Sequence, residues 1–261
     1  MALVGLKTKP TFRWINATLS VILPRLPRWL RLPGAGPLRR PLLFPGVNSM
    51  ADRTLRTAVY IDGFNFYYGT VRGTPYKWTD PVSLFQKVLG EQNSLQKVKY
   101  FTARVQPSTS DPHVNNRQDA YFRALKVHCR ELEIYFGHFL RHRVSMEHAN
   151  PPPATVEVWK NEEKGSDVNL ALHLLNDAWQ DAYDCAVVVS NDSDLAESLR
   201  LVRTHHKKII GLITPGAPKR KTSRQLHRHA DFVAPIRTWM LKNSQLPDPI
   251  PGTRIHKPAG W

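Results

Sequence analysis

Short apolar runs alternate with stretches of helical periodicity between residues 55 and 236, and this alternation is the main pattern in the chain. Two of the runs, Thr57–Ile61 and Cys185–Val189, consist of small, β-branched or aromatic residues, which is typical of parallel strands buried on both faces. Further strand-like runs lie at Val98–Ala103, Glu133–Gly137 with a continuation to Arg143, Thr155–Trp159, Lys207–Ile213 and Asp231–Ile236. The pattern therefore predicts strands spread along the whole domain.

Helical periodicity fills most of the intervals between these runs. Val114–Leu132 has one apolar face, residues 81–90 predict a shorter helix, residues 64–69 predict a helix or turn, and another helix follows Asp194. The clearest helix begins at Asp167, and Ser166 is its expected N-cap. Its expected apolar face consists of Val168, Ala171, Leu172, Leu175, Ala178 and Trp179. Because strands and helices alternate, we expect right-handed crossovers, a mostly parallel sheet and a three-layer α/β/α, Rossmann-like domain.

Acidic residues stand where the predicted elements meet. Asp62 follows the run Thr57–Ile61, Asp192 and Asp194 follow Cys185–Val189, and Asp167 opens the clearest helix. In open α/β sheets, ligands bind in the crevice outside the carboxyl ends of the strands. The alternative is structural, because Asp194 and Glu197 have the spacing of a capping box and acids are favoured at helix starts. The recurrence of acids at several element ends favours a shared site at one edge of the sheet.

Three blocks of sequence carry a resemblance to a known family: Val59–Asn65, Lys164–Val168 and Val189–Asp194. They resemble, in the expected order, the signature blocks of NYN domains, which belong to the PIN-like nuclease superfamily. The resemblance covers about residues 55–236 and implies a metal-dependent ribonuclease with a PIN-like fold. It also implies that Mg²⁺ or Mn²⁺ is held by Asp62, Asp167, Asp192 and Asp194. Two positions depart from the family pattern, namely Ser166, where a hydrophobic residue is usual, and His173, where a further acid is frequent.

Four carboxylates in one pocket suit a divalent cation. Mg²⁺ prefers carboxylate and water oxygens, and without a cation the cluster would repel both its own members and a phosphodiester. A bound ion could polarise the scissile phosphate and supply a hydroxide-like water for in-line attack. The resemblance implies that hydrolysis leaves a 5′-phosphate and a 3′-hydroxyl.

Polar and basic residues near the same element ends are candidates for contacts with RNA, which we expect to be single-stranded. Asn65 is suited to orienting a water or a phosphate, or to capping a turn. Ser190 and Asn191 either donate hydrogen bonds to phosphate or shape the turn that they occupy. Candidates for phosphate contacts, each with an ordinary solvated surface as the alternative, are Lys164, Arg104, Lys219, Arg220, Lys221 and Arg224.

The net charge of +16 indicates a polyanionic partner, with nucleic acid first and an anionic membrane second. Half of that excess lies in residues 1–49, which contain no Asp or Glu, so the rest of the chain is only moderately basic. We expect residues 1–49 to be a disordered basic segment or an upstream mis-start before Met50, with a transit peptide as the alternative. Its apolar runs are too short for stable membrane insertion. Residues 55–243 form the expected domain, and the Pro-rich residues 244–261 are expected to be non-globular or laid along its surface.

Several classes of function lose support from the sequence. Cys129 and Cys185 fit small core residues of a reducing compartment, so a cytoplasmic location is expected, and no CxxC or HExxH motif supports a zinc site. An aspartyl-phosphate phosphatase would need a second acid soon after Asp62, where Gly63 and Phe64 stand. Two classes remain: a metal-dependent ribonuclease, and a catalytically weak RNA-binding or regulatory protein that keeps the acidic pocket. No oligomeric state is predicted.

Overall fold

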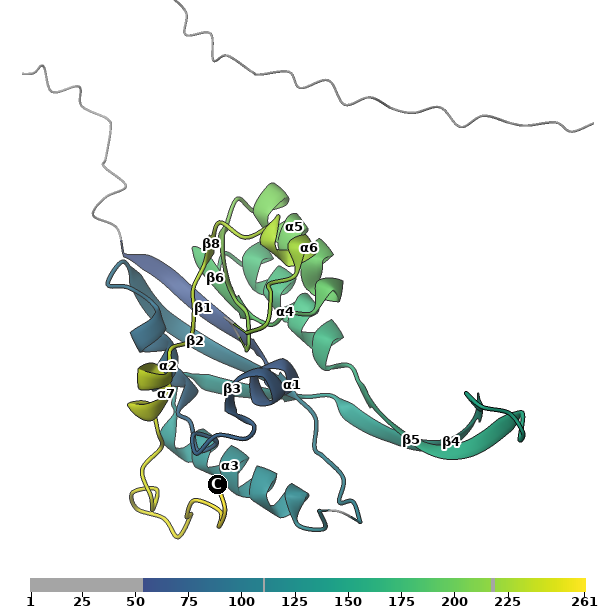
Figure 1. Ribbon diagram of the computed structural model, residues 1–261. Coiled ribbons are helices and arrows are strands. Elements are labelled where there is room, and N and C mark those ends of the chain that lie inside the picture. The colour runs from purple at the N-terminus through teal and green to yellow at the C-terminus, as the bar shows by residue number, and fades with distance from the viewer. Residues whose placement is uncertain (1–53, 110, 217–218) are drawn as a thin grey trace, which may run out of the picture. The chain divides into compact units, whose positions relative to one another are not determined.

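The computed structural model describes residues 54–109, 111–216 and 219–261, so the expectations for residues 1–49 lie outside the described residues (Figure 1). The domain is built on a parallel six-stranded sheet with the order β3-β2-β1-β6-β7-β8. Its strands are β1 (Leu55–Asp62), β2 (Asn93–Thr102), β3 (Leu132–Phe136), β6 (Cys185–Val189), β7 (Ile209–Ile213) and β8 (Phe232–Val233). The expected mostly parallel sheet is confirmed.

Helices cover both faces of this sheet. On one face lie α4 (Ser166–Trp179), α5 (Ala196–His205) and α6 (Arg224–His227). On the other lie α2 (Pro81–Val88), α3 (Val114–His128) and α7 (Thr238–Lys242). The short helix α1 (Gly63–Phe66) follows β1 directly and continues into a π-helical turn at Tyr67–Val71. The three-layer α/β/α architecture is therefore confirmed (Figure 1).

The core is divided between the two faces because successive side chains of a strand point in opposite directions. In β1, Val59 and Ile61 belong to the cluster beneath α2 and α3, whereas Ala58 and Tyr60 belong to the cluster beneath α4 and α5. All four are at most 5% exposed. This double burial explains why the central strands are recognisable as continuous apolar runs.

The buried face of α4 differs from the expected one. Leu170 and Leu174 are fully buried against the sheet, while Val168, Leu172 and Trp179 are 61%, 59% and 80% exposed. Of the expected face only Ala178 is fully buried, with Ala171 and Leu175 partly buried beside the core. The helix carries apolar residues on almost every side, so its periodicity does not select one face. The face that is buried is the one that packs against the sheet.

The start of α4 also differs from expectation. Gly165 occupies the N-cap position with a φ of 94°, a left-handed conformation that favours glycine. Ser166 is the first helical residue rather than the cap, and its backbone N–H and hydroxyl both donate to the carboxylate of Glu163, at 3.0 Å and 2.8 Å. The side chain that satisfies the helix start thus precedes the helix by three residues.

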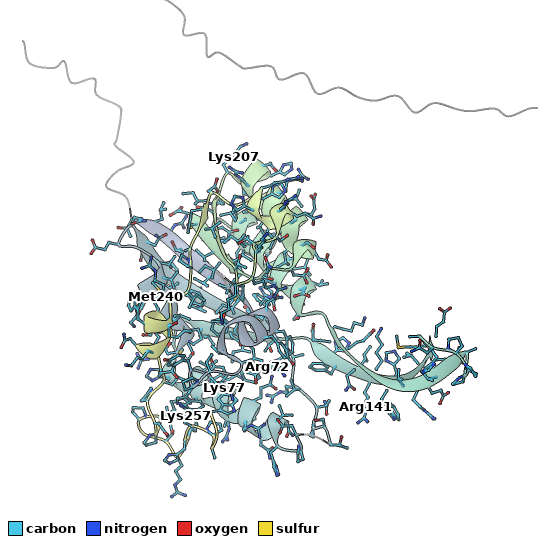
Figure 2. All side chains as sticks on the ribbon, viewed as in Figure 1. Arg72, Lys77, Arg141, Lys207, Met240 and Lys257 are labelled. Atoms are coloured by element: carbon cyan, nitrogen blue, oxygen red, sulfur yellow. The ribbon has the colours of Figure 1, made fainter. Side chains whose placement is uncertain are left out.

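The strand expected to continue from Glu133 to Arg143 is divided into two at Gly137. β3 ends at Phe136, and β4 (His138–Glu147) pairs antiparallel with β5 (Thr155–Lys164) in a separate two-stranded ribbon. A Cβ at Gly137 would collide with the carbonyl of Lys164, so glycine is required where the ribbon leaves the sheet. Figure 2 shows Arg141 on this ribbon, which projects from the main sheet. β5 returns the chain to the start of α4.

The Pro-rich stretch at residues 244–261 lies against the domain, which is one of the two arrangements that the sequence leaves open. Leu246 and Ile250 are 4% and 1% exposed, and the indole Nε1 of Trp78 donates to the carbonyl of Pro247 at 3.1 Å. Cys129 and Cys185 are buried and form no disulfide, as expected for core residues. No helix in the described part of the chain is long and apolar enough to cross a membrane.

Candidate active site

The direction of the strand order reverses between β1 and β6. β2 and β3 lie on one side of β1, while β6, β7 and β8 lie on the other. Such a reversal opens a crevice at the carboxyl ends of the two central strands, which is where α/β sheets bind ligands. Asp62 is the last residue of β1, and Ser190 follows the last residue of β6. Asp62 and the turn that begins at Ser190 therefore lie at the switch point of the sheet.

Asp62 is buried and fully engaged. It is 3% exposed; its Oδ1 accepts the backbone N–H of Asn65 at 2.9 Å, and its Oδ2 accepts the amide of Asn65 at 2.6 Å and the hydroxyl of Ser190 at 2.8 Å. Burial raises the pKa of Asp62, and the neighbouring charge of Asp192 adds to the rise, while the three hydrogen bonds oppose it. Ser190 is itself fully buried, so its contacts match the turn-shaping role left open by the sequence.

The turn after β6 presents Asp192 and Asp194 at the same edge. Ser190 Oγ accepts the backbone N–H of Asp192 at 3.0 Å, and Asp192 Oδ1 accepts the backbone N–H of Asp194 at 3.0 Å. Asp192 thereby caps the short 3₁₀ turn Ser193–Leu195 that leads into α5. The alternative of a capping box between Asp194 and Glu197 is not what holds this turn, because Asp192 provides the cap and Glu197 pairs with Arg200 at 2.6 Å.

Asp167 completes the acidic group from the start of α4. Burial, followed by the charges of Asp62, Asp192, Glu163 and Asp194 in that order, raises its pKa to about 7. The other three aspartates selected from the sequence thus all lie close enough to act electrostatically on Asp167. A carboxylate whose charged form is opposed by four others marks a position where a cation would be stabilised.

Glu163 is the acidic neighbour that the sequence did not single out. It stands immediately before Lys164, and both of its carboxylate oxygens accept hydrogen bonds from Ser166. The available signal was its position one residue ahead of a family block, next to the helix that carries Asp167. Its role visible here is to orient the start of α4 and to add negative charge near Asp167.

The donor set suits a hard divalent cation in its chemistry, because it consists of carboxylates. Among residues 54–109, 111–216 and 219–261, no group of three or more His, Cys, Asp or Glu side chains is arranged to hold a metal ion. Both carboxylate oxygens of Asp62 instead accept hydrogen bonds from Asn65 and Ser190. A cation would have to compete with those hydrogen bonds, and relief of the repulsion around Asp167 would favour its binding.

A basic loop borders the acidic group. Arg220 Nη1 donates to Asn65 Oδ1 at 3.4 Å, which brings this loop to the residue that holds Asp62. Asn191 fixes the loop by donating to the carbonyl of Lys221 at 3.1 Å and accepting the backbone N–H of Ser223 at 2.7 Å. The four cations selected from the sequence in this segment are all exposed: Lys219, Arg220, Lys221 and Arg224.

The two remaining candidates for phosphate contacts, Lys164 and Arg104, form ion pairs with other acids. Lys164 pairs with Glu162 at 2.9 Å, beside the start of α4. Arg104 pairs with Asp119 at 3.0 Å, and its guanidinium lies 4.9 Å from the ring centroid of Phe136.

The departure at His173 places an imidazole against aromatic rings. Its ring centroid lies 4.0 Å from that of Tyr135 and 5.6 Å from that of Phe101. Burial and the nearby charge of Lys99 lower the pKa of His173. His173, on α4, therefore packs its ring against Tyr135 and Phe101 of the sheet. It adds no acid to the group around Asp167.

A three-layer α/β domain with carboxylates at the switch point is consistent with the PIN-like class of nuclease folds. The NYN domain family model matches residues 56–237, and the chain belongs to this family. It is 36% identical over 235 residues to a Pseudomonas putida protein named 6-hydroxy-3-succinoylpyridine 3-monooxygenase HspA, covering 79% of this chain and 75% of that one. A solved Vibrio parahaemolyticus structure, a protein of unknown function, covers 72% of this chain and 96% of that one at 17% identity and a TM-score of 0.46.

Proposed function

We propose that this protein is a metal-dependent ribonuclease that hydrolyses phosphodiester bonds of single-stranded RNA at the acidic group beside β1 and β6. The observation that supports this most is the gathering of Asp62, Asp167, Asp192 and Asp194 near the carboxyl ends of β1 and β6, where burial and repulsion from the neighbouring carboxylates together raise the pKa of Asp167. Folding tolerates such repulsion at functional sites, where a cation or substrate compensates for it.

Each residue has a distinct part in this proposal. Asp62, Asp167, Asp192 and Asp194 would hold Mg²⁺ or Mn²⁺, which when bound polarises the phosphate and lowers the pKa of a water. Asn65 and Ser190 orient the carboxylate of Asp62 through the hydrogen bonds described above. A bound cation would favour the charged form of Asp167, whose pKa is raised by burial and by the neighbouring carboxylates when no cation is present.

The phosphate side of the crevice is assigned to the basic loop. Arg220 contacts Asn65, the residue that holds Asp62, and Lys219, Lys221 and Arg224 are exposed cations close to it in the chain. Cations placed in this way position a nucleic-acid backbone without reading its sequence.

Cleavage of single-stranded RNA by the purified protein is the direct test. We expect EDTA to abolish cleavage and added Mg²⁺ or Mn²⁺ to restore it. Asp62→Asn and Asp192→Asn should each lower kcat by about 100-fold or more, a loss typical for removal of one preorganised electrostatic group. The matched control is Glu131→Gln, an exposed acid on the loop before β3.

The fold of each variant is checked by its thermal midpoint. RNA that binds but is not cleaved by the metal-loaded parent would overturn the proposal in favour of an RNA-binding or regulatory protein. Equal loss of cleavage in the Glu131→Gln control would show that the effect does not arise in the acidic group.

The similarity to the Pseudomonas protein favours a second candidate, oxygenation of a hydroxylated pyridine. In that reaction one atom of O₂ enters the ring, and the other is reduced to water by two electrons from an external donor such as a reduced nicotinamide. Incubation with 6-hydroxy-3-succinoylpyridine, O₂ and NADH, followed by detection of a hydroxylated product, tests it. The acidic group gives this candidate no evident chemistry, so we rank it second.

A further inference from the structure

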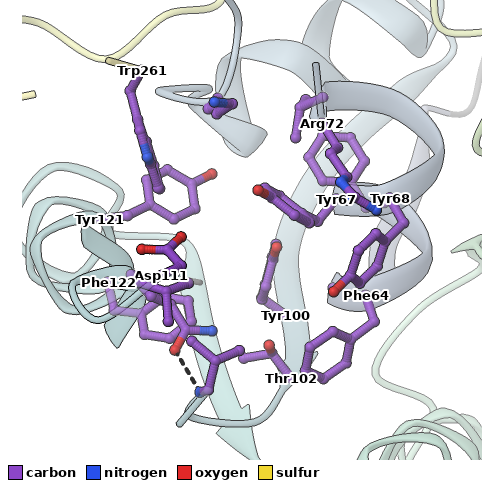
Figure 3. A pocket seen from close by; sticks show the side chains of 17 residues that line it. Phe64, Tyr67, Tyr68, Arg72, Tyr100, Thr102, Asp111, Tyr121, Phe122 and Trp261 are labelled. Carbon is purple, nitrogen blue, oxygen red and sulfur yellow. Dashed lines mark hydrogen bonds between the residues drawn. The ribbon is translucent and has the colours of Figure 1, made fainter. Parts of the chain in front are cut away.

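A cavity of about 410 Å³ lies beside the carboxyl ends of β1 and β2, and neither its location nor its lining is explained by the acidic group (Figure 3). Its volume falls within the range of about 300–1,000 Å³ that is usual for small-molecule sites. Nearly half of the residues in its wall are aromatic, among them Phe64, Tyr67, Tyr68, Tyr100, Tyr121 and Trp261.

The cavity begins next to Asp62 in the chain. Gly63, the residue directly after Asp62, lines the cavity, and a Cβ on Gly63 would lie 2.6 Å from Cε1 of Tyr100. The charge of Asp62 raises the pKa of the Tyr100 phenol, after the larger effect of burial. A ligand in the cavity would therefore contact the residue that follows Asp62, the carboxylate that ends β1.

The aromatic side chains surround an open centre instead of filling it. Figure 3 shows Tyr67 and Tyr100 on one side of that space and Tyr121 on the other, with Trp261 above Tyr121. The rings of Tyr121 and Trp261 are 5.8 Å apart between centroids, and the Tyr121 hydroxyl is held by the carbonyl of Thr79 at 2.7 Å. Rings fixed in this way offer stacking faces to a planar aromatic guest.

Two cations stand in the same lining. The guanidinium of Arg72 lies 5.1 Å from the ring centroid of Tyr68, and Lys77 Nζ donates to the carbonyl of Gly260 at 3.5 Å. Asp111, the acid in the lining, is paired with Arg117, which lowers its pKa. The charges left unpaired by this ion pair are those of Arg72 and Lys77, which are positive. An aromatic ligand with a negatively charged group would therefore suit the cavity.

We propose that this cavity binds a planar aromatic ring that carries an anionic group, and that the ring is one base of the RNA whose backbone lies at the acidic group. The identity of the ring rests on the proposed function; the cavity's preference for an aromatic anion does not. Stacking on protein aromatic rings is a common way to bind unpaired bases, and Arg and Lys are the usual partners of phosphate. The cavity would then require the RNA to be single-stranded, because a paired base cannot enter it.

Isothermal titration of the full chain with AMP, CMP, GMP and UMP in EDTA tests the proposal without metal or turnover. We expect at least one nucleotide to bind, and Arg72→Gln combined with Lys77→Gln to raise its Kd about tenfold or more through loss of charge-assisted contacts. Val105→Trp, which adds an indole to the cavity wall, should abolish binding through steric exclusion.

The matched control replaces two exposed cations outside the cavity, Arg130→Gln combined with Lys242→Gln, and should leave Kd unchanged. Circular dichroism and the thermal midpoint establish that each variant is folded. A parallel titration with 6-hydroxy-3-succinoylpyridine distinguishes the two sources of an aromatic anion.

Binding of a nucleotide that is lost in the cavity variants and kept in the control supports the proposal. Binding of the pyridine compound alone would overturn the assignment to an RNA base. Absence of binding by every ligand at millimolar concentration, or equal effects of cavity and control variants, would overturn the site itself. Nucleotide binding without metal-dependent cleavage would instead remove the ribonuclease proposal and leave the cavity as a nucleotide site.

Discussion

The carboxyls of Asp62 and Asp167 both have raised pKa values, but they differ in their hydrogen bonding. Asp62 accepts three hydrogen bonds. An Asn at this position would place its NH₂ group against hydrogen-bond donors, so part of the stabilisation from these hydrogen bonds would be lost. In the described part of the chain, no hydrogen bond to the side chain of Asp167 is found. Asp167→Asn is therefore the cleaner substitution for measuring repulsion within the acidic group.

Asp167→Asn should remove part of the pH dependence of stability in metal-free protein. The pKa of Asp167 rises from 3.8 to about 7 on folding, so between these values the folded protein keeps a proton that the unfolded chain has released. The stability of the parent therefore falls as pH rises through this window and stays low above it. At pH 8 the variant should be more stable by about 1–2 kcal/mol, after allowance for water screening and a weakened helix-dipole interaction.

Urea unfolding in EDTA between pH 4 and pH 8 measures this difference. Glu131→Gln, which removes an exposed acid, serves as the control and should leave the pH profile unchanged. If Asp167→Asn is less stable than the parent at pH 8 and retains the same pH profile, the carboxylate is a stabilising group and the repulsion argument fails.

At the scale of elements, the segment between β7 and α6 connects the acidic group to a positively charged surface. Asn191, at the end of β6, holds this segment through two hydrogen bonds to the backbone of Lys221 and Ser223. Arg220 contacts Asn65 from the same segment. Its position is thus set by the two strands that carry the acids, which makes it suited to guiding a phosphate backbone toward them.

Removal of the positive charge from this segment should weaken RNA binding similarly for different sequences. Each phosphate of a single strand that is no longer neutralised by a cation reduces the slope of log K against log salt by about 0.7. Filter binding to two unrelated single-stranded RNAs at several salt concentrations measures both effects for the combined replacement by Ala of Lys219, Arg220, Lys221 and Arg224.

A control with the same change in net charge replaces exposed cations elsewhere on the domain by Ala, namely Lys126, Arg130, Lys207 and Lys242. It should retain most of the affinity and most of the slope. A slope that is unchanged in the first variant, or reduced equally in both, would exclude the β7–α6 segment as the RNA surface.

At the scale of the whole molecule, the described residues from Leu55 onward form two apolar clusters on opposite faces of the sheet. The cluster beneath α2 and α3 extends from Val59 in β1 to Ile250 near the end of the chain, and the cluster beneath α4 and α5 extends from Ala58 to Leu226. The NYN family match begins at residue 56, at the same strand. The sequence pattern places every predicted strand and helix of the domain after residue 49, so we expect the first 49 residues to be dispensable for its folding.

A chain that begins at Met50 should accordingly unfold at the same temperature as the full chain and cleave RNA with the same metal requirement. Differential scanning calorimetry and the cleavage assay measure both properties. A thermal midpoint lower by several degrees, which corresponds to about 1 kcal/mol or more for a domain of this size, would show that residues 1–49 stabilise it.

Much of this architecture can be predicted from the sequence, because burial of a strand on both faces produces a local apolar run. The run Cys185–Val189 and the acids after it are adjacent in the chain, so the central strand, its carboxyl end and the family block can be recognised together. The same holds for Asp62 after β1. Their convergence follows from a general property of parallel sheets, in which neighbouring strands end at one edge.

Features that depend on contacts between distant residues were decided only by the tertiary structure. The buried face of α4 was predicted wrongly because the helix is apolar on several sides, and the sheet beneath it selected Leu170 and Leu174. The cavity joins Gly63, Tyr121 and Trp261, which are separated by many residues and share no periodic pattern. Local sequence records whether a residue favours a strand, a helix or burial; it does not record which distant side chain meets it, because that depends on how whole elements pack.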